Sequence, residues 1–171
     1  MLILLLSGNS ERHMKKKNEN IVLSASRMTD MPKFYPLQII EETEKRINKG
    51  WKIHTLVLWT KHPRSLLLNP LHNYLIQLIK NDVLLYVQLT INGLGGITIG
   101  ERLDGKPFIP EPYVPNYKDS LSALPLVAAL IGNPRRIRLR IDPILRISDY
   151  KNKKFSNISL LPQILQSAAE T

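Results

Sequence analysis

The stretch Ile137-Arg-Leu-Arg-Ile-Asp142 alternates apolar and charged side chains. Successive side chains of a β-strand point to opposite faces, so this alternation predicts a strand with one apolar and one polar face. The same division recurs in Leu84-Leu-Tyr-Val-Gln-Leu-Thr-Ile91, in Thr55-Leu-Val-Leu-Trp-Thr60 and in Ile21-Val-Leu-Ser-Ala-Ser26. A sheet covered by helices on both faces has nearly continuous apolar strands instead. We therefore expect these strands to form a sheet with helices on one face and polar side chains on the other.

Helical patterns separate the strand-like stretches. Apolar residues recur at three-to-four spacing over residues 36–50, 70–82, 121–131 and 158–169. Strands that alternate with helices form right-handed βαβ units and a parallel sheet. The sequence therefore predicts an α/β protein whose residues 20–171 form one domain, a partial (half) TIM-type βα barrel with about four parallel strands and helices on the outer face.

The composition fits a globular protein and excludes several kinds of site. The chain has 171 residues, 43% of them apolar and 22% charged, and no cysteine. It therefore has no disulfide, no thiolate nucleophile, no zinc–thiolate site and no iron–sulfur cluster held by this chain alone. Its four histidines lack the spacing of a metal site, so we expect no bound metal.

The N-terminal part of the chain shows no periodic pattern. Residues 1–6 form an apolar run that is too short to cross a membrane, and a polar, lysine-rich stretch follows it. We expect residues 1–19 to be a disordered or loosely ordered extension, with the true start at either Met1 or Met14. Since no apolar run approaches the roughly 20 residues of a membrane span, we expect a cytoplasmic protein without membrane contact.

The net charge of +10 is concentrated in two places. One is the N-terminal stretch, and the other is the segment 135–154, with eight Lys or Arg residues against two Asp residues. A basic segment attracts polyanions such as nucleic acids. Because solvated basic residues near chain ends are commoner, nucleic-acid binding is the weakest of the functional interpretations, and it stays open.

Polar clusters follow the carboxyl ends of the predicted strands, where βα barrels place their catalytic residues. Lysine and arginine there suit a carboxylate or phosphate, and aspartate suits hydrogen-bonding or acid–base roles. We therefore predict a site for a small anionic ligand, with Asp30, Lys61 and Asp142 as candidate catalytic residues. The candidate ligand-binding residues are Ser26, Arg27, Thr29, Trp59, Thr60, Gln88, Thr90 and Arg140. The alternative is that Asp30–Arg27 and Asp142–Arg140 are ion pairs of a polar core; His62 is also of interest, because it follows Lys61.

The same clusters carry a resemblance to a known family. Four segments resemble the ordered motifs of the domain of unknown function 1848 family: Ser24-Ala-Ser-Arg-Met-Thr-Asp-Met-Pro32, Leu58-Trp-Thr-Lys-His-Pro63, Tyr86-Val-Gln-Leu-Thr90 and Arg140-Ile-Asp-Pro-Ile-Leu145. Glu111-Pro-Tyr-Val-Pro115 resembles that family's loop after the third strand. The resemblance covers about residues 21–147.

This resemblance implies a radical-SAM-like barrel enzyme whose complete relatives use an iron–sulfur cluster and S-adenosylmethionine. Those relatives continue into a cysteine cluster that this chain lacks, so it resembles their N-terminal half only. They also usually have a second arginine where this chain has Met28, which weakens an anion site built from paired arginines. On this interpretation the chain is a truncated or split enzyme half, completed by a chain that supplies the C-terminal half.

Whether the chain is itself an enzyme stays open at this point. A short parallel sheet leaves two strand edges and one face uncovered. The chain is therefore alternatively a non-catalytic interaction module that pairs with a second copy of itself, as a homo-oligomer, or with a complementary half. The sequence indicates neither the substrate nor the reaction.

Overall fold

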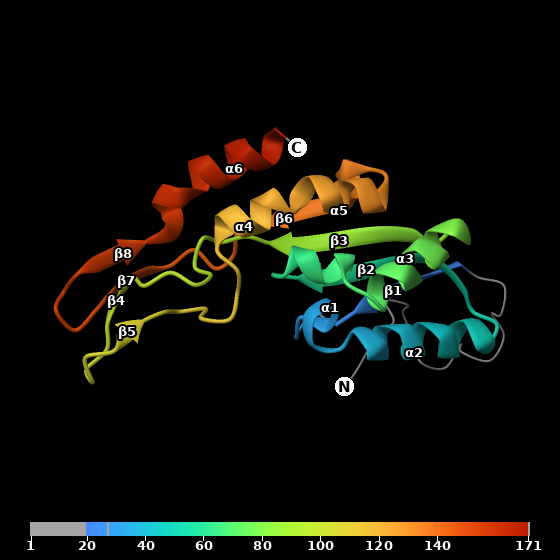
Figure 1. The fold of residues 1–171 in the computed structure, drawn as a ribbon, viewed down its shortest axis with the longest axis horizontal. Helices are drawn as coiled ribbons and strands as arrows, with labels where there is room; N and C mark the ends of the chain where they lie inside the picture. Colours follow the sequence, from blue (N-terminus) through green and yellow to red (C-terminus); the bar gives the residue numbers. More distant parts are fainter. Residues whose placement is uncertain (1–19, 27, 171) are drawn as a thin grey trace.

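A parallel sheet of four strands, in the order β1-β2-β3-β6, lies at the centre of the computed structural model (Figure 1). The model describes residues 20–26 and 28–170. The strands are β1 (Asn20–Ala25), β2 (Lys52–Thr60), β3 (Leu84–Thr90) and β6 (Ile137–Arg140). Each neighbouring pair is parallel, so the predicted α/β class is confirmed, as is the sheet of four parallel strands.

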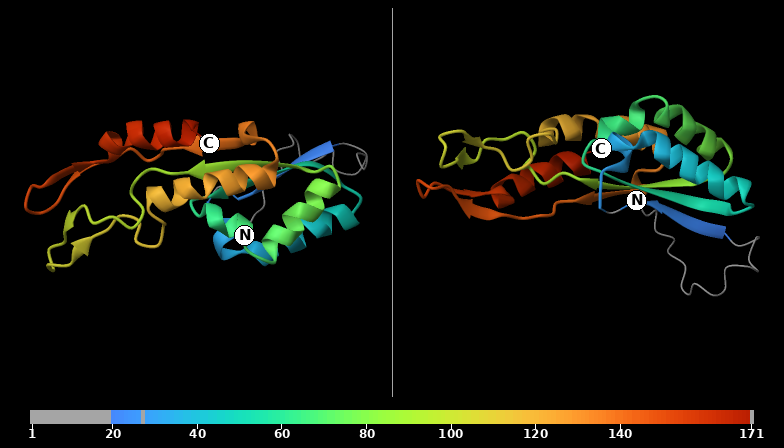
Figure 2. Two further views of the ribbon diagram at one scale, coloured as in Figure 1. Left: turned by 45° about the horizontal axis from the view of Figure 1, so that its top comes forward. Right: turned by 90° about the horizontal axis from the view of Figure 1, so that it is seen from below.

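Helices connect the strands of the sheet, and one further helix follows the last hairpin. They are α1 (Met31–Phe34), α2 (Pro36–Asn48), α3 (Leu71–Lys80), α4 (Tyr117–Ser122), α5 (Leu124–Ile131) and α6 (Leu161–Ala169), with 3₁₀ turns at Pro63–Leu67, Pro134–Arg136 and Asn157–Leu160. Figure 2 shows α2, α3 and α5 together on one side of the sheet. None of the helices in the described part of the chain has the length and apolar content of a membrane span.

The two faces of the sheet differ in burial as the alternation predicts. Leu85, Val87 and Leu89 of β3 are buried, whereas the residues between them are partly exposed. We call this second side the open face; it carries Val57, Trp59, Tyr86, Gln88, Thr90, Arg138 and Arg140, which are neighbours in the strand register. The predicted division into an apolar and a polar face is therefore confirmed, while closure into part of a barrel stays a prediction.

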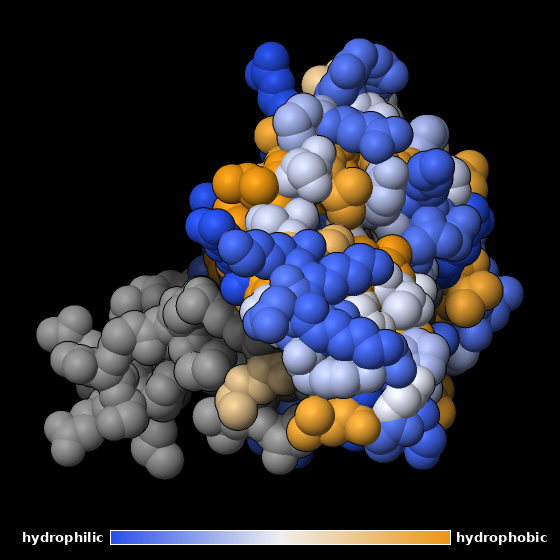
Figure 3. Space-filling view, turned by 90° about the vertical axis from the view of Figure 1, so that its left-hand side faces the viewer, coloured by the Kyte–Doolittle hydropathy of each residue, from blue (hydrophilic) through white to orange (hydrophobic). Residues whose placement is uncertain are grey.

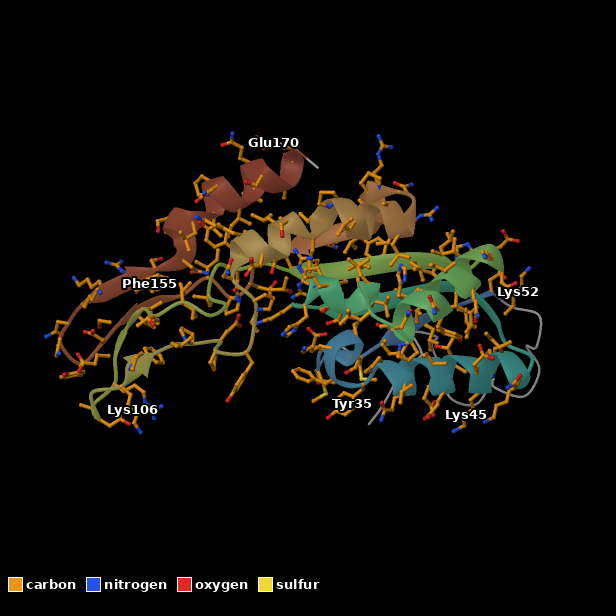
Figure 4. All side chains as sticks on the ribbon, in the orientation of Figure 1. Tyr35, Lys45, Lys52, Lys106, Phe155 and Glu170 are labelled. Carbon is orange, nitrogen blue, oxygen red and sulfur yellow. The ribbon has the colours of Figure 1, made fainter. Side chains whose placement is uncertain are left out.

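Two hairpins project from the carboxyl-terminal end of the parallel sheet (Figure 1). The first, β4 (Gly100–Glu101) with β5 (Pro107–Phe108), lies within the long connection between β3 and α4. The second, β7 (Arg146–Ser148) with β8 (Lys154–Ser156), was not expected. Figure 4 labels Lys106 and Phe155 on these hairpins, and Lys52 at the opposite end of the molecule. A side chain at Gly100 would bring a Cβ within 2.7 Å of Asp149 Cβ, so glycine allows the hairpins to approach.

Two of the expected helices are interrupted in the structure. The pattern over 121–131 divides into α4 and α5, and the pattern over 158–169 begins as a 3₁₀ turn before α6. A proline occupies the first turn of α5 and of α6, where its missing N–H is not needed, so each proline starts a new helix. The N-cap of α4 is Asn116, whose side chain accepts a hydrogen bond from Asp119 N.

Candidate functional site

The carboxyl ends of the parallel strands meet around one cavity of about 280 Å³. Most of the predicted site residues line it: Thr29, Asp30, Trp59, Thr60, Lys61, Gln88, Thr90, Arg140 and Asp142, together with Met28 and Pro143. Figure 3 looks onto this end of the molecule, where hydrophilic side chains surround separate apolar patches. These side chains converge as predicted, because the carboxyl ends of parallel strands lie at the same edge of the sheet.

One described site residue, Ser26, does not line the cavity. Ser26 is buried, and its hydroxyl oxygen accepts a hydrogen bond from Met28 N at 3.1 Å, so it stabilises the local turn. Arg27 lies outside the described residues, as does the expected N-terminal extension over residues 1–19. The suggested ion pair between Asp30 and Arg27 accordingly stays a prediction.

Arg140 and Asp142 form a bidentate ion pair at the cavity. Arg140 donates from Nε to Asp142 Oδ1 at 2.9 Å and from Nη2 to Oδ2 at 2.7 Å. The hydrogen bonds from Arg140 hold the pKa of Asp142 below its ordinary value. The same contact raises the pKa of Arg140. Asp142 is thus ionised at neutral pH and oriented toward Arg140. The ion pair between these two residues, left open by the sequence, is therefore present.

Trp59 supports Arg140 from the neighbouring part of the open face. The guanidinium carbon of Arg140 lies 4.9 Å from the centroid of the Trp59 ring, a cation–π distance. The indole Nε1 donates to Ser24 Oγ at 3.1 Å, which fixes the ring against β1. Arg140 is therefore held by a carboxylate and by an aromatic ring at once.

Lys61 pairs with a carboxylate from the long connection between β3 and α4. Its Nζ donates to Glu111 Oε1, and the Asn92 side chain donates to the same oxygen at 3.4 Å. The second oxygen of this carboxylate, Glu111 Oε2, is buried without a hydrogen-bond partner in the described part of the chain. The two described cationic side chains of the cavity, Lys61 and Arg140, are therefore each paired with a carboxylate.

The carboxylate of Asp30 is occupied by hydrogen bonds from the chain itself. Oδ2 accepts from Thr60 Oγ1 at 2.9 Å, from Lys61 N at 2.7 Å and from His62 Nδ1 at 2.7 Å. Oδ1 accepts from Lys33 N at 3.1 Å and so caps α1. With its oxygens used in this way, Asp30 positions the end of β2 and is poorly placed to take a proton from a ligand.

His62 lies beside this network and is 9% exposed. Its Nδ1 contacts Asp30, its Nε2 lies 2.9 Å from the carbonyl oxygen of Tyr113, and the Phe34 ring meets it edge-on at 5.9 Å. Burial lowers the pKa of His62, but the hydrogen bonds to Asp30 and Tyr113 raise it. The pKa therefore lies above its ordinary value of 6.5. The charged form of His62 is therefore more stable, relative to the neutral form, than it is in a free imidazole.

Asn157 joins the segments that follow β3 and β6. It is fully buried, its Nδ2 donates to Asn92 O at 2.7 Å and to Pro143 O at 3.0 Å, and its Oδ1 accepts from Leu145 N at 2.8 Å. Sequence reasoning missed Asn92 and Asn157, since an asparagine in an aperiodic segment carries no pattern. Glu111 was noted only through the family resemblance.

Several polar groups in the cavity remain available to a ligand. The side chains of Gln88 and Thr90 have no hydrogen-bond partner among the described residues, and the Arg140–Asp142 pair uses only two of the five guanidinium N–H groups. A second hollow of about 580 Å³ continues along the open face and shares Trp59, Gln88, Arg140 and Asp142 with the first. The arrangement can therefore hold a small polar molecule by several directed hydrogen bonds.

The described residues form no metal-binding group, and the sequence supplies no cysteine for an iron–sulfur cluster. Among residues 20–26 and 28–170, no group of three or more His, Cys, Asp or Glu side chains is arranged to hold a metal ion. The chain also has no cysteine, so the cluster that the family resemblance implies has no thiolate ligand here.

Comparisons of the chain with protein-family models, with curated proteins and with solved structures give no match.

Proposed function

We propose that this chain is a βα half-barrel that binds a small anionic ligand at the carboxyl end of its sheet. The observation that carries the proposal is the cavity of about 280 Å³, in which Lys61, Gln88, Thr90 and Arg140 meet from three strands or strand ends. Concave sites with a few convergent polar groups are the usual places for small ligands. Parallel α/β sheets bind ligands beyond the carboxyl ends of their strands.

In the proposed binding mode, Arg140 is the principal anion-binding group. Its guanidinium is already oriented by Asp142 and Trp59, and its unused N–H groups suit two oxygens of a phosphate or carboxylate. The Gln88 amide and the Thr90 hydroxyl supply further donors. Because Asp142 and Glu111 balance the local charge, the site favours a singly or doubly charged small anion over a polyanion.

The resemblance to the domain of unknown function 1848 family supports a wider version of this proposal. In that version the open face is the inner wall of a radical-SAM-like barrel, whose remaining strands and cluster ligands come from another polypeptide segment. The polar side chains on the open face and the helices on the other face support such a wall. No step of radical chemistry follows from the residues of this chain.

The binding proposal is tested by nuclear magnetic resonance titration of the whole chain with inorganic phosphate and, separately, with succinate. We expect chemical-shift changes at the amides of Gln88 and Thr90 and at the indole N–H of Trp59. Changes confined to the basic segment 146–154 would place the anion on the β7–β8 hairpin and contradict the proposal. Performing the titration at about 50 mM salt keeps electrostatic binding strong, and DNA or RNA added under the same conditions tests the nucleic-acid interpretation.

A second candidate function is pairing with a second copy or a complementary half. It is favoured by β6, which ends the sheet with no further strand partner in the described part of the chain, and by the hollow of about 580 Å³ beside it. Ile144, which lines this hollow, is 52% exposed. Size-exclusion chromatography with light scattering over a wide concentration range tests self-pairing: a monomer at every concentration would contradict it.

A further inference from the structure

His62 connects the end of β2 with two segments that are distant in sequence. One partner is Asp30, which precedes α1, and the other is the carbonyl of Tyr113 in the connection that leads to α4. The ring is buried, so water does not replace either partner freely. The two contacts therefore decide which protonation state the imidazole adopts.

Both partners of the His62 ring are hydrogen-bond acceptors. An Asp30 carboxylate oxygen lies 2.7 Å from Nδ1, and the Tyr113 carbonyl oxygen lies 2.9 Å from Nε2. Only the imidazolium form carries a proton on both ring nitrogens. In the neutral form the negatively charged Asp30 retains the Nδ1 proton, and Nε2 then directs a lone pair at the Tyr113 carbonyl. The Tyr113 contact is thus the one that deprotonation removes.

The segment that His62 holds also carries Glu111, the partner of Lys61. Its backbone is attached to the start of the same connection, because Gly96 N donates to Glu111 O at 2.9 Å, and Val114 N donates to the same oxygen at 3.3 Å. Gly95 packs directly against the backbone of Pro115. The Tyr113 carbonyl is therefore connected, through this segment, to residues 95–96 and to the Glu111 carboxylate at the cavity.

We propose that His62 is a pH-operated latch, which in its protonated form holds residues 111–115 against the end of β2 and on deprotonation releases them together with the Glu111–Lys61 pair. Release frees the Lys61 ammonium for an incoming anion. This last step rests on the proposed function, whereas the release of the segment does not. The latch thus makes the anion site more accessible as the pH rises.

The charged and titratable groups around His62 come from every element that packs on it. They are Asp30 and Lys33 at α1, Lys61 and Arg64 beside it in the chain, Glu111 and Tyr113 on the held segment, and Asp119 on α4. Burial and the charge of Lys33 lower the pKa of His62, whereas Asp30 and the Tyr113 carbonyl raise it. Since the net shift is upward, the latch is closed at pH values well below the raised pKa of His62 and opens as the pH rises through that pKa.

The test is hydrogen exchange of the whole chain without ligand, from about pH 5.5 to about pH 8.5, corrected for the intrinsic exchange rate. We expect the protection of the Gly96 and Val114 amides to fall at least about tenfold over this range in the native sequence. In H62Q this pH-dependent step should disappear, because glutamine does not titrate. The control is H54Q, since His54 is exposed and its side chain hydrogen-bonds to its neighbour Thr55; it should retain the step. A pH step that persists in H62Q would overturn the latch.

A second measurement uses the native sequence and so does not depend on whether H62Q folds. Nitrogen-15 spectra of the His62 ring should show protons on both nitrogens at about pH 6 and on Nδ1 alone at high pH. A neutral ring at about pH 6 would overturn the proposal. Phosphate titrations at both pH limits separate the two proposals: a pH step in exchange without phosphate binding refutes the anion site alone, and phosphate binding without the step refutes the latch alone.

Discussion

Arg140 on β6 reaches across the open face to Trp59 on β2, where its guanidinium carbon lies 4.9 Å from the centroid of the indole ring. The strand β3 separates β2 from β6 in the sheet, so the arginine side chain extends over β3 to make this contact. Asp142 holds the other side of the guanidinium. The sheet thus supplies an arginine whose position is fixed before any ligand arrives.

Replacing Arg140 by alanine should weaken phosphate binding at least about tenfold, equivalent to about 1.4 kcal/mol, as measured by isothermal titration calorimetry. The melting temperature should change little, because the Arg140 side chain is 33% exposed and its ion pair stabilises by at most about 1 kcal/mol. The matched control is R135A, which removes an exposed arginine that does not line the cavity. Equal losses of affinity in the two variants would show a diffuse charge effect and no defined site.

Replacing Asp30 by alanine should lower the free energy of unfolding by roughly 3 kcal/mol, since it removes the cap of α1 and leaves Thr60 Oγ1, Lys61 N and His62 Nδ1 without their acceptor. Asp104 offers a control: its carboxylate also accepts a backbone hydrogen bond, from Lys106 N at 3.2 Å, but in an exposed turn. D104A should cost less than about 1 kcal/mol. Urea unfolding followed by circular dichroism measures both, and a loss in D30A no larger than in D104A would contradict the positioning role.

Truncating two neighbouring residues of β3 should change different properties: the stability of the fold at Leu89 and phosphate binding at Gln88. Leu89 is fully buried under the helices, so L89A should cost about 2–5 kcal/mol of unfolding free energy. Gln88 points to the open face, so Q88A should cost less than about 1 kcal/mol but should weaken phosphate binding. Denaturant unfolding and calorimetry on the same two variants distinguish the faces, and a large stability loss in Q88A would show that the open face is packed.

Replacing Asn157 by alanine should cost roughly 2–3 kcal/mol of unfolding free energy, because the Asn92 and Pro143 carbonyls and the Leu145 N–H lose their buried partner. N157D should be at least as destabilising, since an ionised carboxylate donates no hydrogen bond to the two carbonyls. N73A, at an exposed position of α3, is the control and should change stability by less than about 0.5 kcal/mol. If N157D were as stable as the native chain, the assigned hydrogen bonds would be wrong.

Much of this architecture was predictable because its signals are local. The alternation in residues 137–142 and 84–91 reports which side of a strand is buried, and burial follows directly from side-chain direction. The convergence of Lys61, Gln88 and Arg140 follows from parallel strands that end at one edge. The β7–β8 hairpin escaped prediction, because three-residue strands are too short to show a period.

The sequence by itself determined the parallel sheet, its apolar and polar faces and the row of polar residues at the strand ends, because periodicity and connectivity are written in consecutive residues. Only the tertiary structure decided what those residues do there. It paired Lys61 with Glu111, surrounded the Asp30 carboxylate with donors, and set His62 between two acceptors. Such contacts join segments 30 or more positions apart through aperiodic loops, and their geometry exists only once the sheet has brought those loops together.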